Sequence, residues 1–106
     1  MKIDEFRKAV REEQQLHVND DYNAEKYYIT ALVILTENIE ETIAFLDYEC
    51  TASEFSWLSS IFEEIAERTR SKDFIECLWR VAKKFPEECE TYNVHAFIRD
   101  AEELLE

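Results

Sequence analysis

No glycine occurs anywhere in this chain, and Pro86 is its only proline. Tight β-hairpin turns need positive φ angles, which glycine adopts at the lowest cost, and phosphate-binding loops need glycine where the backbone approaches the ligand. Both kinds of structure are therefore disfavoured. Hydrophobic residues make up 46% of the 106 residues, which is enough for a buried core without disulfides or a metal. We therefore predict a single all-α domain spanning residues 1–106.

The stretch 51–85 carries the clearest helical pattern, and both tryptophans lie in it. Thr51 and Glu54 are spaced as a capping box, in which each side chain accepts a hydrogen bond from the other residue's backbone amide. Ser71 offers a second N-cap, and Pro86 ends the second helix because the residue before a proline is biased away from helical angles. We expect two helices packed back to back, joined at residues 70–72, to form the core.

Further helices are expected on both sides of this stretch. A first amphipathic helix covers 2–16, and a loop at 17–21 precedes a second helix over 22–36. The second helix is apolar nearly all round, which predicts a central buried position. Its β-branched run would also suit a strand, but no turn signals bracket it. Asn38 then opens a third helix.

The C-terminal part adds one or two helical turns at 87–92 and a last helix from residue 94. The whole pattern predicts five or six antiparallel helices. Residues 22–50 and 51–85 both read as helix–turn–helix units of similar length. Two architectures therefore remain open, an antiparallel helical bundle and a short HEAT-like stack of helical hairpins.

The formal net charge is −13, from 25 acidic and 12 basic residues. Such a surface repels nucleic acid and anionic lipid and attracts basic proteins. We therefore predict a basic protein partner, with no nucleic-acid or membrane ligand. The alternative is that the acidity only keeps a small protein soluble.

The acidic residues gather in two blocks on either side of a neutral middle. Residues 51–86 carry six acids and six bases, whereas 22–50 carry six acids and one base, and 87–106 carry seven acids and one base. Carboxylates beside exposed tyrosines suit a protein interface, where the aromatic rings supply binding energy and the charges steer the encounter. Ordinary solvated helix faces would give the same pattern. The predicted partner-binding residues are Glu37, Glu40, Glu41, Asp47, Tyr48, Glu49, Glu87, Glu88, Glu90 and Tyr92.

No pattern indicates catalysis, a cofactor or a metal. Cys50, Cys77 and Cys89 form no CxxC pair, and the sequence contains no HxxxH motif. An odd number of thiols at apolar positions is typical of reduced cysteines in the cytosol. The N-terminus has no signal-peptide pattern and no apolar run is long enough for a bilayer, so we expect a cytoplasmic protein that is not an enzyme.

A small, glycine-poor, strongly acidic, all-helical chain resembles the immunity proteins of bacterial toxin systems, which are compact inhibitors, some of them with HEAT-like folds. The resemblance rests on size, on the acidic blocks 37–49 and 87–106, and on the helical middle of the chain. It implies binding to a basic toxin domain, such as a nuclease, with carboxylates in place of substrate phosphates. The competing hypothesis is a small helical adaptor or structural domain that binds its partner through an apolar groove.

Overall fold

The computed structural model describes residues 1–17 and 20–106, and every regular element within them is helical. The predicted all-α class is therefore confirmed. The elements are α1 (Ile3–Gln14), α2 (Asp21–Glu37), α3 (Ile39–Tyr48), α4 (Ala52–Leu58), the 3-10 turn η1 (Ser59–Ile61), α5 (Phe62–Thr69), α6 (Lys72–Ala82), α7 (Pro86–Tyr92) and α8 (Val94–Leu104).

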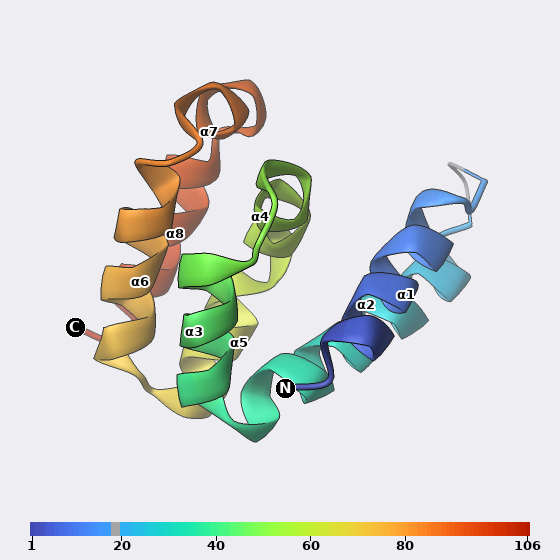
Figure 1. The fold of residues 1–106 in the computed structure, drawn as a ribbon, viewed down its shortest axis with the longest axis horizontal. Helices are drawn as coiled ribbons and strands as arrows, with labels where there is room; N and C mark the ends of the chain where they lie inside the picture. Colours follow the sequence, from blue (N-terminus) through green and yellow to red (C-terminus); the bar gives the residue numbers. More distant parts are fainter. Residues whose placement is uncertain (18–19) are drawn as a thin grey trace.

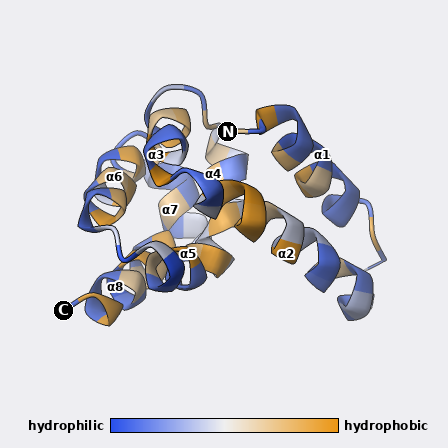
Figure 2. Cartoon of the chain, turned by 90° about the horizontal axis from the view of Figure 1, so that it is seen from below, coloured by the Kyte–Doolittle hydropathy of each residue, from blue (hydrophilic) through white to orange (hydrophobic). Residues whose placement is uncertain are grey.

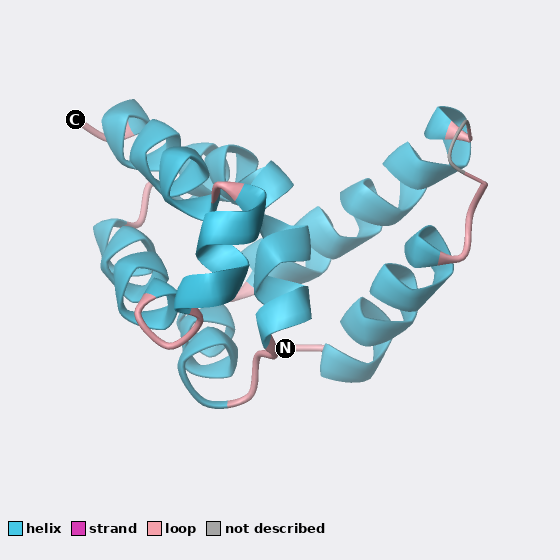
Figure 3. Ribbon diagram, turned by 90° about the horizontal axis from the view of Figure 1, so that it is seen from above, coloured by secondary structure: helices cyan, strands magenta, loops and turns pink. Residues whose placement is uncertain are grey.

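The long helices form two rows (Figures 2 and 3). One row contains α1, α3 and α6, and the other contains α2, α5 and α8. Helices within a row run in the same direction, whereas the two rows run in opposite directions, and α4 and α7 lie side by side across one end (Figure 1). The rings of Phe6 and Phe45, 5.6 Å apart, link α1 to α3. The core therefore lies between the rows.

Residues 39–69 and 72–104 share one design: a helix of ten or eleven residues, a seven-residue helix, and a third helix of eight residues in α5 and eleven in α8. Accordingly α3 packs along α6, α4 along α7 and α5 along α8. The expected units 22–50 and 51–85 are therefore wrong, and so is the expected back-to-back pair within 51–85. Although α5 and α6 are consecutive, α5 packs mainly on α8, and α6 packs mainly on α3 and α8.

The helix expected over 51–69 is divided at η1. Three serine hydroxyls donate to backbone carbonyls three residues earlier in this region, including Ser59 to Ser56 at 2.6 Å and Ser60 to Trp57 at 3.2 Å. Such local bonds compete with regular helical geometry. The expected number of five or six helices is therefore too low, since the described residues contain eight α-helices.

The predicted helix starts are confirmed where their caps are local. Thr51 and Glu54 form the capping box, and Asn38 and Ser71 accept hydrogen bonds from the amides of Glu41 and Phe74. Asp20 caps α2, so Asp21 is already helical. Positions 18 and 19 of the expected loop lie outside the described residues.

The prediction for α2 is right about helix and wrong about burial. Leu32 and Leu35 are buried, but Ile29 is 51% exposed and Val33 is 46% exposed. Both point away from α1 and α5, the helices on which α2 packs, because they lie on the side of α2 opposite to its buried residues. This face is joined by Tyr22, which is exposed.

Two helix ends reach the left-handed region without glycine. Arg70 after α5 has φ of 51°, and Asn93 after α7 has φ of 54°. Each residue's amide donates back to a carbonyl of the preceding helix. Asparagine tolerates this conformation better than arginine does, so Arg70 is the more strained of the two.

Candidate protein-binding surface

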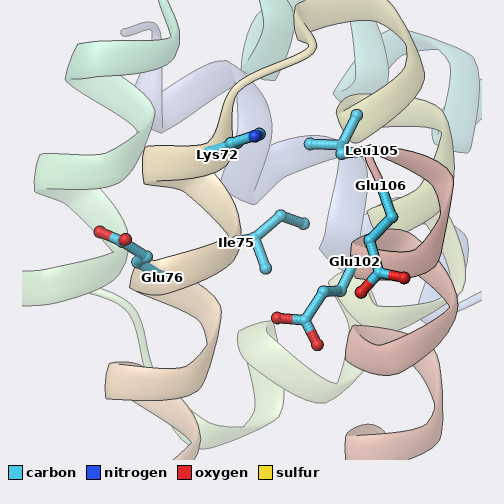
Figure 4. Close-up of a pocket in the computed structure, with 6 residues that line it drawn as sticks. All are labelled: Lys72, Ile75, Glu76, Glu102, Leu105 and Glu106. Atoms are coloured by element: carbon cyan, nitrogen blue, oxygen red, sulfur yellow. The ribbon is translucent and has the colours of Figure 1, made fainter.

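Two open depressions flank α6, and they meet at Glu76. The first lies between α3 and α6 and is lined by Glu40, Ile43, Asp73, Glu76 and Arg80. The second lies between α6 and α8 (Figure 4) and is lined by Lys72, Ile75, Glu76, Glu102, Leu105 and Glu106. Glu76 lines both, so the two depressions adjoin one another at this residue. The α6 acidic surface is defined here by Glu40, Asp73, Glu76, Glu102 and Glu106.

Helical spacing explains why these carboxylates are outside. The buried face of α6 includes Phe74, Ile75 and Leu78, so Asp73 and Glu76 fall on its exposed side. Asp73 lies in the first turn of α6, where the helix dipole favours an anion. Glu102, near the C-terminal end of α8, has no such local benefit, and no basic residue occupies that last turn. Its carboxylate is therefore not placed there for helix stability.

The carboxylates of the α6 acidic surface carry no ion pair among the described residues. The ion pairs of the described residues all involve other carboxylates. They join the N-terminal ammonium to Glu41, Arg7 to Glu54, Lys8 to Glu12, and Arg80 to Asp47. Arg80 therefore lines the first depression but is held by Asp47 at 3.0 Å. The bond from this guanidinium also lowers the pKa of the Asp47 carboxyl from its ordinary value, against an opposing effect of burial. Lys72 is the remaining base on the surface.

Glu102 is the carboxylate whose orientation is fixed. The indole Nε1 of Trp79, on α6, donates a hydrogen bond to Oε2 of Glu102 at 3.3 Å. The Trp79 ring also lies 5.8 Å from the ring of His95 on α8. These contacts tie α8 to α6 along the wall of the second depression.

The structure separates the residues of the first predicted block. Glu37 ends α2, and Glu40 and Glu41 lie in the first turn of α3. Tyr48 and Glu49 lie at the other end of α3, about 12 Å further along the helix. Only Glu40 lines the α6 acidic surface. Two members of the block are engaged within the molecule: Glu41 by the N-terminal ammonium and Asp47 by Arg80.

The partner-binding residues predicted from the second block lie on α7, at the end of α6 away from the α6 acidic surface. Glu102 and Glu106, which belong to the same block but were not among the predicted residues, line that surface. Glu87 and Glu88 line a depression with Ala52 and Lys84, and Glu88 accepts a hydrogen bond from the Ser56 hydroxyl. Glu90 is exposed. Tyr48 and Tyr92 are also exposed, at 86% and 56%. The ten predicted residues therefore do not form one site.

Asp73 and Glu76 were not predicted as binding residues because the net charge of residues 51–86 is zero. Their signal was positional, since they lie three residues apart on the polar side of a helix, and helical neighbours at that spacing share a face. The charge total counted Arg80 against them, but its guanidinium bonds to Asp47 on α3.

The three thiols are buried and bonded to oxygen acceptors. Cys50 donates to Thr51 O, Cys77 contacts Ile43 O and Asp47 Oδ1, and Cys89 donates to Ala82 O. Burial raises the pKa of Cys50 and of Cys77 to about 12. Raised thiol pKa values oppose reactivity, because the thiolate is the nucleophile and the metal ligand.

The described part of the chain, residues 1–17 and 20–106, shows neither a metal cluster nor a membrane-spanning helix. No cluster of three or more histidine, cysteine, aspartate or glutamate residues in that part could hold a metal ion. No helix there is long and apolar enough to cross a membrane.

Comparison with known proteins gives no relative for this chain. No protein-family model, no curated protein and no solved structure matches it.

Proposed function

We propose that this protein is a non-catalytic binding domain whose partner is a basic protein held by the α6 acidic surface. The observation that carries the proposal is the pair of depressions joined at Glu76. They present five carboxylates with no ion pair among the described residues, beside the apolar side chains of Ile43, Ile75 and Leu105. Unpaired acids steer a basic partner to the surface, and apolar contacts slow its release.

The most specific form of this proposal is an immunity-type inhibitor of a basic toxin domain. A nuclease active site is built to bind phosphates, so closely spaced carboxylates compete for the same basic groups. The large acidic excess of the chain supports this reading, since steering grows with the charge of the whole molecule. The inhibitor covers the active site and takes part in no chemistry.

We also propose the HEAT-like stack as the architecture, in preference to a plain bundle. Two rows of parallel helices and two units of the same build, starting 33 positions apart at Ile39 and Lys72, support it. Stacked helical units offer extended surfaces along each row, which suits recognition of another protein. The first depression lies between neighbouring helices of one row.

The test is affinity capture from the source cell's lysate with three versions of the protein. One is unchanged, one carries Glu40→Gln, Asp73→Asn and Glu76→Gln, and one carries Glu63→Gln, Glu64→Gln and Glu67→Gln on the exposed side of α5. Both variants lose three charges. We expect the unchanged protein and the α5 variant to retain the same basic protein until salt is raised, and the α6 variant to lose it.

Purified partner then tests the inhibitor reading, because its activity should fall in proportion to the complex formed. Equal capture by all three versions, or retention of no basic protein at low salt, would overturn the proposal.

A helical adaptor remains the second candidate, and the exposed face of α2 favours it. Tyr22, Ile29 and Val33 follow one another along that face at spacings of seven and four residues. A partner bound there would be held mainly by apolar burial, so its affinity should change little with salt. Salt dependence of the captured complex therefore separates the two candidates.

A further inference from the structure

The depression between α6 and α8 differs from the rest of the acidic surface because apolar side chains form its walls. Ile75 points from α6 towards α8, and Leu105 lies across from it (Figure 4). The carboxylates of Glu102 and Glu106 stand on the α8 side of the same opening. The apolar side chains therefore lie in the middle of the depression, with two carboxylates on its α8 side and the ammonium of Lys72 on its α6 side.

We propose that this depression receives one arginine or lysine side chain of the partner. These side chains combine an aliphatic stem with a cationic head, and they lay the stem on apolar surface while the head stays at the polar edge. Ile75 and Leu105 match the stem, and Glu102 with Glu106 match the head. The inference rests on the proposed function, because it names the group of the basic partner that enters this surface.

Charge identifies this occupant over an uncharged or acidic one. Three glutamates and one lysine, Lys72, line the depression, so its net charge is negative. The carboxylates of Glu102 and Glu106 stand at the opening, whereas that of Glu76 points away from α8 (Figure 4). An acidic side chain would be repelled, and an apolar one would leave the carboxylates without a partner. Trp79 holds Glu102 at the wall, so little side-chain entropy is lost when the cation binds.

Lys72 gives the depression a built-in competitor. Its ammonium lies at the α6 side of the opening and repels an incoming cation (Figure 4). Lys72→Gln should therefore strengthen binding of a basic side chain, whereas Lys83→Gln, an exposed change outside the depression, should do so less. The comparison separates a local effect from a change in net charge.

The two indole N–H resonances of the protein provide the readout. Trp79 Nε1 donates to Glu102 in the depression, whereas Trp57 Nε1 donates to Glu13 on α1 at 2.7 Å. A cation that enters the depression should shift the Trp79 indole signal in a ¹⁵N correlation spectrum and leave that of Trp57 unchanged. The probes are three end-capped peptides of otherwise uncharged residues. One contains a single arginine, the second a single residue with a guanidinium group on a shorter aliphatic stem, and the third a single glutamate.

We expect the arginine peptide to shift the Trp79 signal, the short-stem peptide to bind more weakly, and the glutamate peptide to have no effect. Glu102→Gln should weaken arginine binding about twofold to fivefold, the range of one partly exposed ion pair. Glutamine still offers an acceptor to Trp79, so the wall is retained. Glu103→Gln is the matched control, since Glu103 is exposed on the same helix and does not line the depression.

The inference is overturned if the Trp79 signal does not move, if E102Q and E103Q behave alike, or if the short-stem peptide binds as well as arginine. Any of these results leaves capture by the wider acidic surface intact. Conversely, the Trp79 indole signal could shift with the arginine peptide while no basic protein is captured from the lysate. That result would confirm that the depression binds a basic side chain and would refute the proposed function.

Discussion

Arg7 of α1 donates through Nε to Oε2 of Glu54 at 2.8 Å, while the other oxygen of the same carboxylate accepts from the amide of Thr51. One side chain thus caps α4 and binds α1. Arg7 also donates to Glu49 O and lies over the ring of Phe45, 5.5 Å from its centroid. The pKa of Arg7 is raised, chiefly by the bond to Glu54.

Arg7→Gln should loosen the attachment of α1. Glu54 is buried, so removal of its cationic partner leaves a poorly solvated carboxylate, and we expect a loss of about 1–2 kcal/mol in the free energy of unfolding. Glu54→Gln should cost less than Glu54→Ala, because glutamine still completes a capping box. Urea unfolding gives the energies. Amide exchange should quicken in α1 more than in α8, and a uniform increase would contradict the local role.

The thiols should be inert while the protein is folded. With a pKa near 12 for Cys50 and Cys77, only about 1 thiol in 10,000 is ionised at pH 8. Ellman's reagent should react with three thiols in urea and with almost none in buffer. Rapid reaction of the folded protein would show that the burial described here is not maintained in solution.

The same thiols should make the fold sensitive to alkali. Their folded pKa values lie above the ordinary 9.0, so the folded state retains protons that the unfolded state releases. Stability is therefore unaffected below about pH 9 and falls as pH rises from there towards 12. A variant with Cys50→Ala and Cys77→Ala should show a shallower fall above pH 9 than the unchanged protein, by urea unfolding at each pH.

Replacing Arg70 by glycine should stabilise the protein. Arg70 occupies the left-handed region, which costs a residue with a Cβ about 1–2 kcal/mol, and glycine recovers part of this after its own entropy is counted. We expect Arg70→Gly to add about 0.5–1 kcal/mol and Asn93→Gly to add less. Arg68→Gly, two residues earlier in the last turn of α5, is the control and should destabilise. A lower urea midpoint for Arg70→Gly would contradict the assigned backbone conformation.

The exposed face of α2 should accept polar residues. Ile29→Gln and Val33→Gln should each change the free energy of unfolding by no more than about 0.5 kcal/mol, since both side chains are half in solvent. Leu32→Ala, on the buried side, should cost about 2–5 kcal/mol. Urea unfolding compares the three. A large loss for Ile29→Gln would mean that this face is covered in solution.

Sequence patterns predicted the local features of the fold because both partners of each local contact are close in the chain. The caps at Asn38, Thr51 and Ser71 need only a hydroxyl or amide group three residues before a free backbone amide. Helical periodicity likewise depends on neighbouring residues alone. These features would form in almost any arrangement of the helices.

Which helices pack against each other could not be predicted from such local patterns. An apolar stripe shows that a helix face is covered and not by which helix, so α5 was expected beside α6 and lies mainly on α8. The same limit applies to Ile29 and Val33, whose hydropathy fits burial although none of the described helices covers them. Tertiary contacts override local preference at both places.

The candidate site was partly predicted for a related reason. Counting charge by sequence block covered Glu40, Glu102 and Glu106, although only Glu40 was among the predicted binding residues. The count also selected Asp47 and Glu41, whose partners are distant in sequence. It passed over Asp73 and Glu76, which belong to a neutral block and reach the surface through helix geometry. Charge becomes a guide to binding only after the internal ion pairs are known.

The two-row arrangement bears on how the chain reaches its native state. Residues 39–69 have packed neighbours on both sides, the α1–α2 pair on one and residues 72–104 on the other. Each outer unit has such a neighbour on one side. A folding nucleus is stabilised most where a unit contacts neighbours on both of its sides. Nucleation should therefore be centred on residues 39–69. The flanking helices would then add to it from either direction, and the chain could begin folding before its last helix is available.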